Sequence, residues 1–232
     1  MTADEEIPEP VFEINVPLPE MIDLPMLPQR VMHGTPGDRL TGRVSFGVPY
    51  VRPLDSDALT DLGLREFAGQ GAVRAFRLLA LQVNFAVDRD DLVLDATVGV
   101  ILRNDSPTSP GAPLARTLEP MRLAGPVTRS STVAVTAKLG IVEPQVTRQT
   151  TGSGGDPLLV ADGLGSSEPV WFFRRTGRQN LEGSYQLMMV VEVPPAARAS
   201  AMLALAASVR HRKFGIIRYR AQMPPDLALV RL

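Results

Sequence analysis

Two runs in the middle of the chain alternate strongly apolar positions with smaller or polar ones. They span residues 77–87 and 92–102 and flank the acidic turn Asp88–Asp91. Period-two alternation is typical of β-strands with one buried face, and two such strands around a short turn predict a β-hairpin. The apolar positions are Leu79, Leu81, Val83, Phe85, Val87, Leu92, Leu94, Ala96, Val98, Val100 and Leu102.

Further segments carry the same signal. We expect strands at 39–51, at 131–142 with a continuation over 145–151, at the aromatic run 169–175, at 184–193 and at 213–223, and a short closing segment at 226–232. The segment 184–193 is apolar on both faces, which is typical of a central strand. Residues 196–210 combine an alanine content that favours a helix with an alternation that favours a strand, and the surrounding short β segments lead us to expect a strand.

One helix is predicted over 55–68. Asp55 or Ser56 can cap its start, Leu59, Leu62 and Phe67 fall on one side, and Gly69 follows its end. Gly63 inside this segment weakens the helix pattern. Residues 104–113 and 150–168 have no regular pattern and are rich in proline, glycine and serine, so we expect loops there.

The first 30 residues differ from the rest. They contain six prolines interleaved with apolar residues and seven acidic residues, and no basic residue precedes Arg30. Prolines at this density exclude a helix and predict an extended arm, whose apolar side chains favour packing on its own domain or on a neighbour. The sequence therefore predicts an acidic, proline-rich arm at 1–30 and a single β-sandwich-like domain at 31–232.

The overall expectation is a mainly β protein, an antiparallel β-sandwich of about eight strands with one short helix and the extended N-terminal arm. A chain of 232 residues with 44% hydrophobic and 21% charged residues is long and apolar enough for one such domain. Nearly all basic residues are arginine, which we interpret as a GC-rich bacterial coding signature.

Charge and cysteine content narrow the function classes. A net charge of −1 gives no global field toward nucleic acid or an anionic membrane. With no cysteine, disulfides, thiolate nucleophiles and cysteine-held metals are excluded. The acidic N-terminus does not look like a signal peptide, and no apolar run reaches about 18 residues, so the expected location is the cytoplasm.

No motif points to catalysis, a cofactor or a metal. The glycines near 152–155 and 163–165 lack the lysine and the strand-to-helix setting of phosphate-binding loops. His33 and His211 have no metal ligand at local spacing, and the aspartates at 88–95 are typical of a solvated turn. We expect no cofactor, and an enzyme is the less favoured class.

The remaining candidates concern partners. Basic and aromatic residues gather in the last third of the chain, where arginines could pair with an acidic segment or with phosphates while aromatic rings stack on bases. The leading hypothesis is a non-catalytic structural or assembly protein whose arm contacts a neighbouring subunit or another protein. Alternatives are a ligand-binding or catalytic β-domain that uses loops 104–113 and 150–168, nucleic-acid binding through the basic strands, and a pore-forming hairpin at 127–151. The candidate partner-binding residues are Phe12, Ile14, Val16, Leu18, Arg210, Arg212, Arg218 and Arg220.

Overall fold

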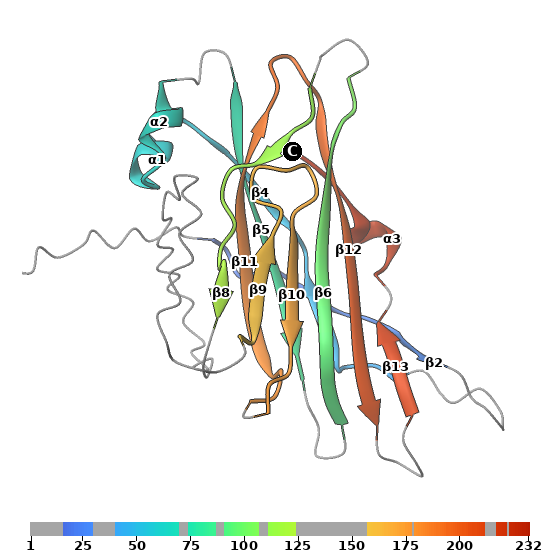
Figure 1. Ribbon diagram of the computed structural model, residues 1–232. Helices are drawn as coiled ribbons and strands as arrows, with labels where there is room; N and C mark the ends of the chain where they lie inside the picture. The colour runs from blue at the N-terminus through green and yellow to red at the C-terminus, as the bar shows by residue number, and fades with distance from the viewer. Residues whose placement is uncertain are drawn as a thin grey trace, which may run out of the picture.

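Two antiparallel sheets packed face to face form the protein. The computed structural model describes residues 16–29, 40–69, 74–86, 91–106, 111–123, 157–177, 179–211, 217–221 and 223–232. In Figure 1, β9, β10, β6 and β12 lie side by side toward the viewer, with β5 and β11 behind them. The mainly β antiparallel sandwich expected from the sequence is therefore confirmed.

The six-stranded sheet is built around two long central strands. Its order is β1-β3-β5-β11-β7, and β4 also pairs with β5. The strands β5 and β11 pair over eleven residues, from Ala75↔Val193 to Phe85↔Gly183. The bounds are β1 Met21–Asp23, β3 Val44–Gly47, β4 Tyr50–Leu54, β5 Ala75–Phe85, β7 Leu114–Ala115 and β11 Gly183–Val193.

The eight-stranded sheet is centred on β6 and β12. Its order is β2-β13-β12-β6-β10-β9-β8, and β14 pairs with the far end of β12. A register shift between Ser208 and Val209 marks a bulge in the long β6–β12 ladder. The bounds are β2 Met26–Gln29, β6 Asp91–Asn104, β8 Arg122–Leu123, β9 Leu159–Asp162, β10 Val170–Arg174, β12 Ala199–His211, β13 Ile217–Ala221 and β14 Leu229–Arg231.

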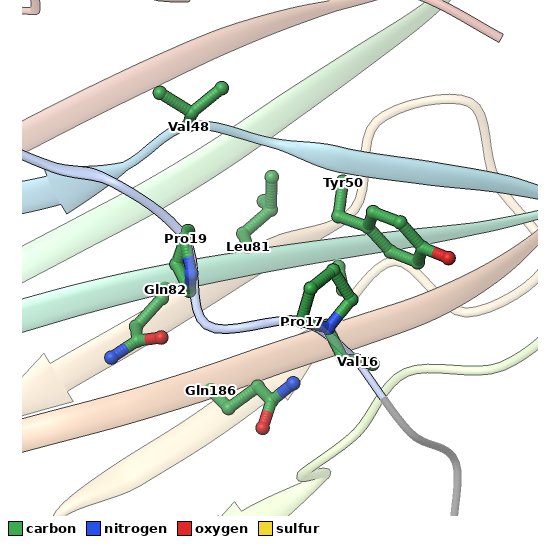
Figure 2. A pocket seen from close by; sticks show the side chains of 9 residues that line it. Val16, Pro17, Pro19, Val48, Tyr50, Leu81, Gln82 and Gln186 are labelled. Carbon is green, nitrogen blue, oxygen red and sulfur yellow. The ribbon is translucent and has the colours of Figure 1, made fainter.

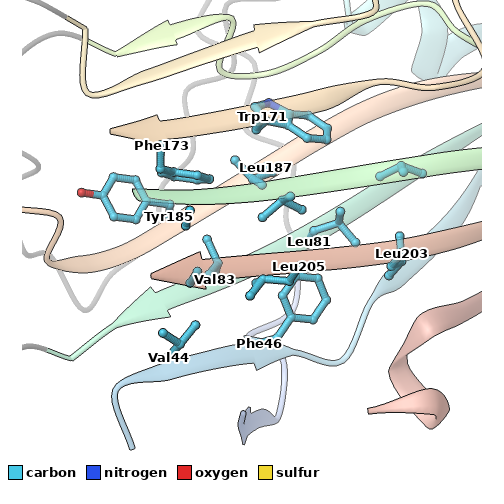
Figure 3. Close-up of a cluster of buried hydrophobic side chains, with 14 of the residues drawn as sticks. Val44, Phe46, Leu81, Val83, Trp171, Phe173, Tyr185, Leu187, Leu203 and Leu205 are labelled. Carbon is cyan, nitrogen blue, oxygen red and sulfur yellow. The ribbon is translucent and has the colours of Figure 1, made fainter. Parts of the chain in front are cut away.

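The main core lies between the two sheets, where alternate residues of both inner faces meet (Figure 3). Trp171 is fully buried there, and the rings of Phe85, Phe173 and Tyr185 pack against one another with centroids 5.1 to 5.7 Å apart. Burial of so many apolar side chains is the dominant stabilising contribution to the fold.

A second, smaller core covers the outer face of the six-stranded sheet. Helices α1 (Ser56–Asp61) and α2 (Arg65–Ala68) lie at that face, at the upper left in Figure 1. They explain why β5 and β11 are apolar on both faces, since Leu78 and Val190 point away from the main core and are still buried. The cluster consists of Leu54, Leu59, Leu62, Leu64, Phe76, Leu78, Ala80, Met188 and Val190.

Residues 16–29 of the predicted arm are built into both sheets. β1 forms an edge of the six-stranded sheet by pairing with β3, and β2 forms an edge of the eight-stranded sheet by pairing with β13. Between them the chain crosses from one sheet to the other, and Leu24 and Met26 are completely buried in the main core. This part of the chain closes one side of the sandwich.

The predicted hairpin between residues 77–87 and 92–102 is wrong. Both segments are strands, but β5 belongs to the six-stranded sheet and β6 to the eight-stranded sheet, so they face each other across the core. Alternation shows that a strand has one apolar face, and that face is equally well buried beside or opposite the next strand. The long partners β11 and β12, which lie much later in the chain, decide the pairing.

The other secondary-structure predictions are partly confirmed. Residues 199–211 form a strand and β11 lies between β5 and β7, both as expected. The single helix is split, because Gly63 adopts a φ of +75° after α1, and a third helix, α3, covers Pro225–Ala228. Fourteen strands are found in the described residues instead of about eight, because the edges consist of short pieces. The strand expected at 131–142 and its continuation at 145–151 lie outside the described residues, as does the hairpin at 127–151.

Candidate partner interface

Three of the predicted arginines lie together on the outer face of the eight-stranded sheet. Arg210 on β12 is the direct cross-strand partner of Arg218 on β13, and Arg220 lies opposite Ser208 two residues along. The neighbours Val209 and Tyr219 point into the core, so the arginines point outward. The fourth arginine of the prediction, Arg212, lies outside the described residues. We call Arg210, Arg218 and Arg220 the arginine cluster.

The positive charges of the arginine cluster are not paired with acidic side chains in the described residues. Like charges directly opposite on neighbouring strands destabilise a sheet by roughly 0.2–1 kcal/mol. Within the described part of the chain, none of the three arginines makes an ion pair, and the buried Nε of Arg210 has no hydrogen-bond partner. An acidic group placed here would relieve the repulsion and satisfy this donor.

The predicted arm residues reach different places. Phe12 and Ile14 lie outside the described residues. Val16 is half-buried and packs against the second core, whereas Leu18 is 71% exposed. Val16 and Leu18 therefore lie on the six-stranded sheet, on the opposite side of the sandwich from the arginine cluster.

A shallow groove lies beside Val16, the first described residue of the arm. Val16, Pro17 and Pro19 lie across Tyr50 and the cross-strand pair Gln82 and Gln186 (Figure 2). The Oε1 atom of Gln186 is buried there without a hydrogen-bond partner. Pro17 and Pro19 have no backbone N–H to offer it. Gly47 permits the close approach, because a Cβ at that residue would lie 2.7 Å from the Cγ of Pro19.

A later part of the arm lies directly beside the arginine cluster. Leu27 on β2 is the cross-strand partner of Arg220, and Gln29 is the partner of Arg218. Leu27 is 42% exposed on this face. Val16, the first described residue of the arm, packs on the other sheet, so the thickness of the sandwich separates Val16 from the cluster.

Most aromatic residues that were candidates for base stacking are in the core. Trp171 and Phe173 are at most 1% exposed and Tyr219 is 5% exposed, while Phe172 is 47% exposed. Phe214 lies outside the described residues. Rings buried in the core cannot stack on bases without unfolding the sheet, which weakens the argument for nucleic-acid binding.

His211 belongs to an ion cluster that the sequence did not reveal. Its Nδ1 is hydrogen-bonded to Oδ1 of Asp91, and the Nε of Arg43 donates to Oδ2 of the same carboxylate. The Asp91 side chain is 1% exposed. Arg43 directly precedes β3, whereas Asp91 and His211 belong to the eight-stranded sheet, so the cluster joins the two sheets. Arg43 and His211 lie 48 and 120 residues from Asp91 in the sequence, so no local sequence pattern indicates this cluster.

The arrangement around His211 differs from a catalytic triad. A triad needs a nucleophile hydrogen-bonded to the second ring nitrogen. In the described residues the His211 ring contacts Asp91 and packs edge-to-face on Tyr219, with centroids 6.3 Å apart. The cluster is a structural link between sheets. His33 lies outside the described residues.

A second buried carboxylate stabilises the opposite end of the sandwich. Glu192 on β11 accepts hydrogen bonds from Arg74 and from the Nε of Arg116, and its side chain is 7% exposed. The guanidinium of Arg116 also lies 5.7 Å from the centroid of the Phe67 ring. Burial, and secondarily the charge of Arg74, lower the pKa of Arg116. This network joins α2 to the sheet beneath it.

The predicted loops are partly structured. β9 forms within the expected loop 150–168, and β6 extends to Asn104 at the start of the expected loop 104–113. Their polar groups are used locally, since the side chain of Asn104 donates to the carbonyl of Gly111 and Ser166 Oγ donates to the carbonyl of Gly163. Residues 107–110 and 150–156 lie outside the described residues.

Glu119 has the most perturbed carboxyl group of the described residues. Burial raises its pKa from 4.5 to about 7. Because the folded chain then holds this proton to a higher pH than the unfolded chain, stability is lost as the pH rises from about 4.5 to about 7.

We therefore predict a pH-dependent gain for Glu119→Gln. The variant should be more stable than the parent at pH 8 by about 1 kcal/mol, a value reduced by solvent screening of this half-buried group, and equally stable at pH 4.5. Urea unfolding at both pH values, followed by the fluorescence of Trp171, measures the difference. A constant difference between the two proteins at both pH values contradicts the assignment.

The described part of the chain also contains neither a candidate metal site nor a helix that could span a membrane. It contains no group of three or more His, Asp or Glu side chains placed to hold a metal ion. No helix in it has the length and apolar character needed to cross a membrane. Comparison with known proteins adds no relative, because the chain matches neither a protein-family model nor a curated protein.

Proposed function

We propose that the protein is a non-catalytic assembly protein whose acidic N-terminal segment, residues 1–15, binds the arginine cluster of a neighbouring copy. The observation that supports this most directly is the arginine cluster itself, three outward arginines on adjacent strands without an ion pair in the described residues. Residues 1–15 supply five carboxylates and no lysine or arginine.

The position of Val16 is compatible with a contact to a neighbouring copy. Val16 is held on the outer face of the six-stranded sheet, whereas the arginine cluster faces outward from the other sheet. Fifteen extended residues reach about 50 Å, which is enough to cross to an adjacent copy. The apolar residues Val11, Phe12 and Ile14 can add hydrophobic contacts to the ion pairs, which gives such a contact more affinity than exposed ion pairs alone.

The test measures binding of a fluorescent peptide of residues 1–15 to a chain that starts at Val16. We expect saturable binding that weakens as salt rises from 50 to 300 mM, because exposed charges are screened. The double variant Arg210→Gln/Arg218→Gln should weaken binding at least tenfold, about 1.4 kcal/mol. The matched control Arg103→Gln/Arg231→Gln removes exposed arginines at the other end of the same sheet and should leave binding unchanged.

Two results would count against the proposal. Absence of peptide binding at low salt excludes the contact, and equal loss in both double variants shows only a general attraction to positive charge. Strong binding of a single-stranded oligonucleotide that also depends on Arg210 and Arg218 would favour the nucleic-acid alternative instead.

A further inference from the structure

The outer face of the eight-stranded sheet carries an uncharged strip beside the arginine cluster. Outward positions on β6 between Asp95 and Arg103 are Thr97, Gly99 and Ile101. Those on β12 between Ser200 and Arg210 carry no charge either. Phe172 is 47% exposed, and Val160 and Ile101 are each 37% exposed. The strip consists of Thr97, Gly99, Ile101, Val160, Val170, Phe172, Met202, Ala204 and Ala206.

The register arranges large and small side chains on opposite sides of β6. Phe172 on β10 and Ala206 on β12 are both partners of Thr97. One row further, Val170 and Ala204 are both partners of Gly99. Each of these two rows therefore has a large side chain on one flank, a small residue in the middle and an alanine on the other flank, whereas the next row pairs Ile101 with Met202.

This pattern is self-complementary under one kind of symmetry. We propose that the strip is the interface of a homodimer in which two copies pack face to face about a two-fold axis parallel to β6. Rotation about such an axis leaves every residue at the same level along the strands and exchanges the β10 side of the face with the β12 side. Phe172 of each copy therefore lies over Ala206 of the other. An axis perpendicular to the strands would place β10 over β10 and β12 over β12. The large side chains of β10 would then face each other, and so would the alanines of β12.

Charges at the border of the strip fit the same axis. Asp95 on β6 lies close to the axis, and Arg174 is its cross-strand partner on β10. In the dimer the two Asp95 side chains lie opposite each other at the axis, and the Arg174 side chains of both copies flank them and offset their repulsion. Complementary charges of this kind fix the register of two surfaces.

The size of the face suits a weak dimer. From Asp95 to Gly99 the face is four strands wide (β9, β10, β6 and β12), or about 19 Å at about 4.8 Å spacing, and toward Arg103 it is three strands wide (β6, β12 and β14), or about 14 Å. Over the length of about 26 Å each copy thus contributes roughly 430 Å², or about 860 Å² in total, which is the size of transient interfaces. The interface goes beyond the proposed arm contact and does not require residues 1–15.

The experiment measures solution mass by sedimentation equilibrium over a concentration series, for the full chain and for residues 16–232. Since the strip does not involve the arm, both should dimerise. Ala206→Phe should abolish the dimer, because it meets Phe172 of the other copy, and Phe172→Ala should weaken it at least tenfold. The double variant Phe172→Ala/Ala206→Phe exchanges the large and small positions and should restore the dimer.

Leu18→Ala is the control, because it removes an exposed apolar side chain from the other face and should leave the mass unchanged. Circular dichroism verifies that each variant is folded. A parent chain that stays monomeric at every concentration overturns the interface, and so does a double variant that fails to recover. Dimerisation of residues 16–232 without binding of the 1–15 peptide would support this interface and contradict only the arm contact.

Discussion

A chain that starts at Val31 is expected to lose at least about 5 kcal/mol of folding stability, whereas a chain that starts at Val16 should stay within about 1 kcal/mol of the full protein. Removal of residues 1–30 deletes β1 and β2, and with them an edge strand of each sheet. Leu24 and Met26 are 0% exposed, and fully burying such side chains contributes about 1.5–3 kcal/mol each. Their loss also uncovers core residues of β3.

Urea unfolding followed by Trp171 fluorescence compares the three chains, since the only tryptophan of the protein is fully buried. Domain stabilities are typically about 5–15 kcal/mol, so the shorter chain is expected to be unfolded or close to it. The point variant Leu24→Ala should cost about 2–5 kcal/mol, and Leu18→Ala, at a side chain 71% exposed, should cost almost nothing. Equal urea midpoints for the chains starting at Val16 and Val31 would show that the arm does not contribute to the core.

The second large effect is expected at Asp91. Asp91→Ala should destabilise the protein by about 3 kcal/mol, because it leaves the charged Arg43 and the partly buried His211 without their shared carboxylate. The value lies at the lower end for broken buried ion pairs, since the side chains of Arg43 and His211 are 24% and 15% exposed. The change also removes a link between the two sheets.

Asp61→Ala is the control for this prediction. Asp61 is the last residue of α1, is exposed, lies outside both proposed interfaces, and should change stability by no more than about 0.5 kcal/mol. Thermal and urea unfolding of the two variants under identical conditions measures the contrast. If both variants unfold at the parent's urea concentration, Asp91 has no role in joining the sheets.

The sequence by itself determined the strands and the class of fold. Alternation in β5, β6 and β12, and apolar character on both faces of β11, follow from which side chains must leave water, and that information is local. The cap at Asp55 was also readable, because a side-chain acceptor acts within a few residues, whereas the sequence predicted one helix across Gly63, where the structure has two. The clustering of arginines near the C-terminus was visible in the same way.

Only the tertiary structure decided which strands are neighbours and which charges meet. The pattern of β5 and β6 is equally consistent with a hairpin and with opposite sheets, and β11 and β12 select the latter through long ladders. Asp91 finds His211 across 120 residues because the strand β6 pairs with β12 along its whole length. The arm residues Leu24 and Met26 are core residues for the same reason: their environment is made by strands distant in sequence, and local patterns carry no information about such contacts.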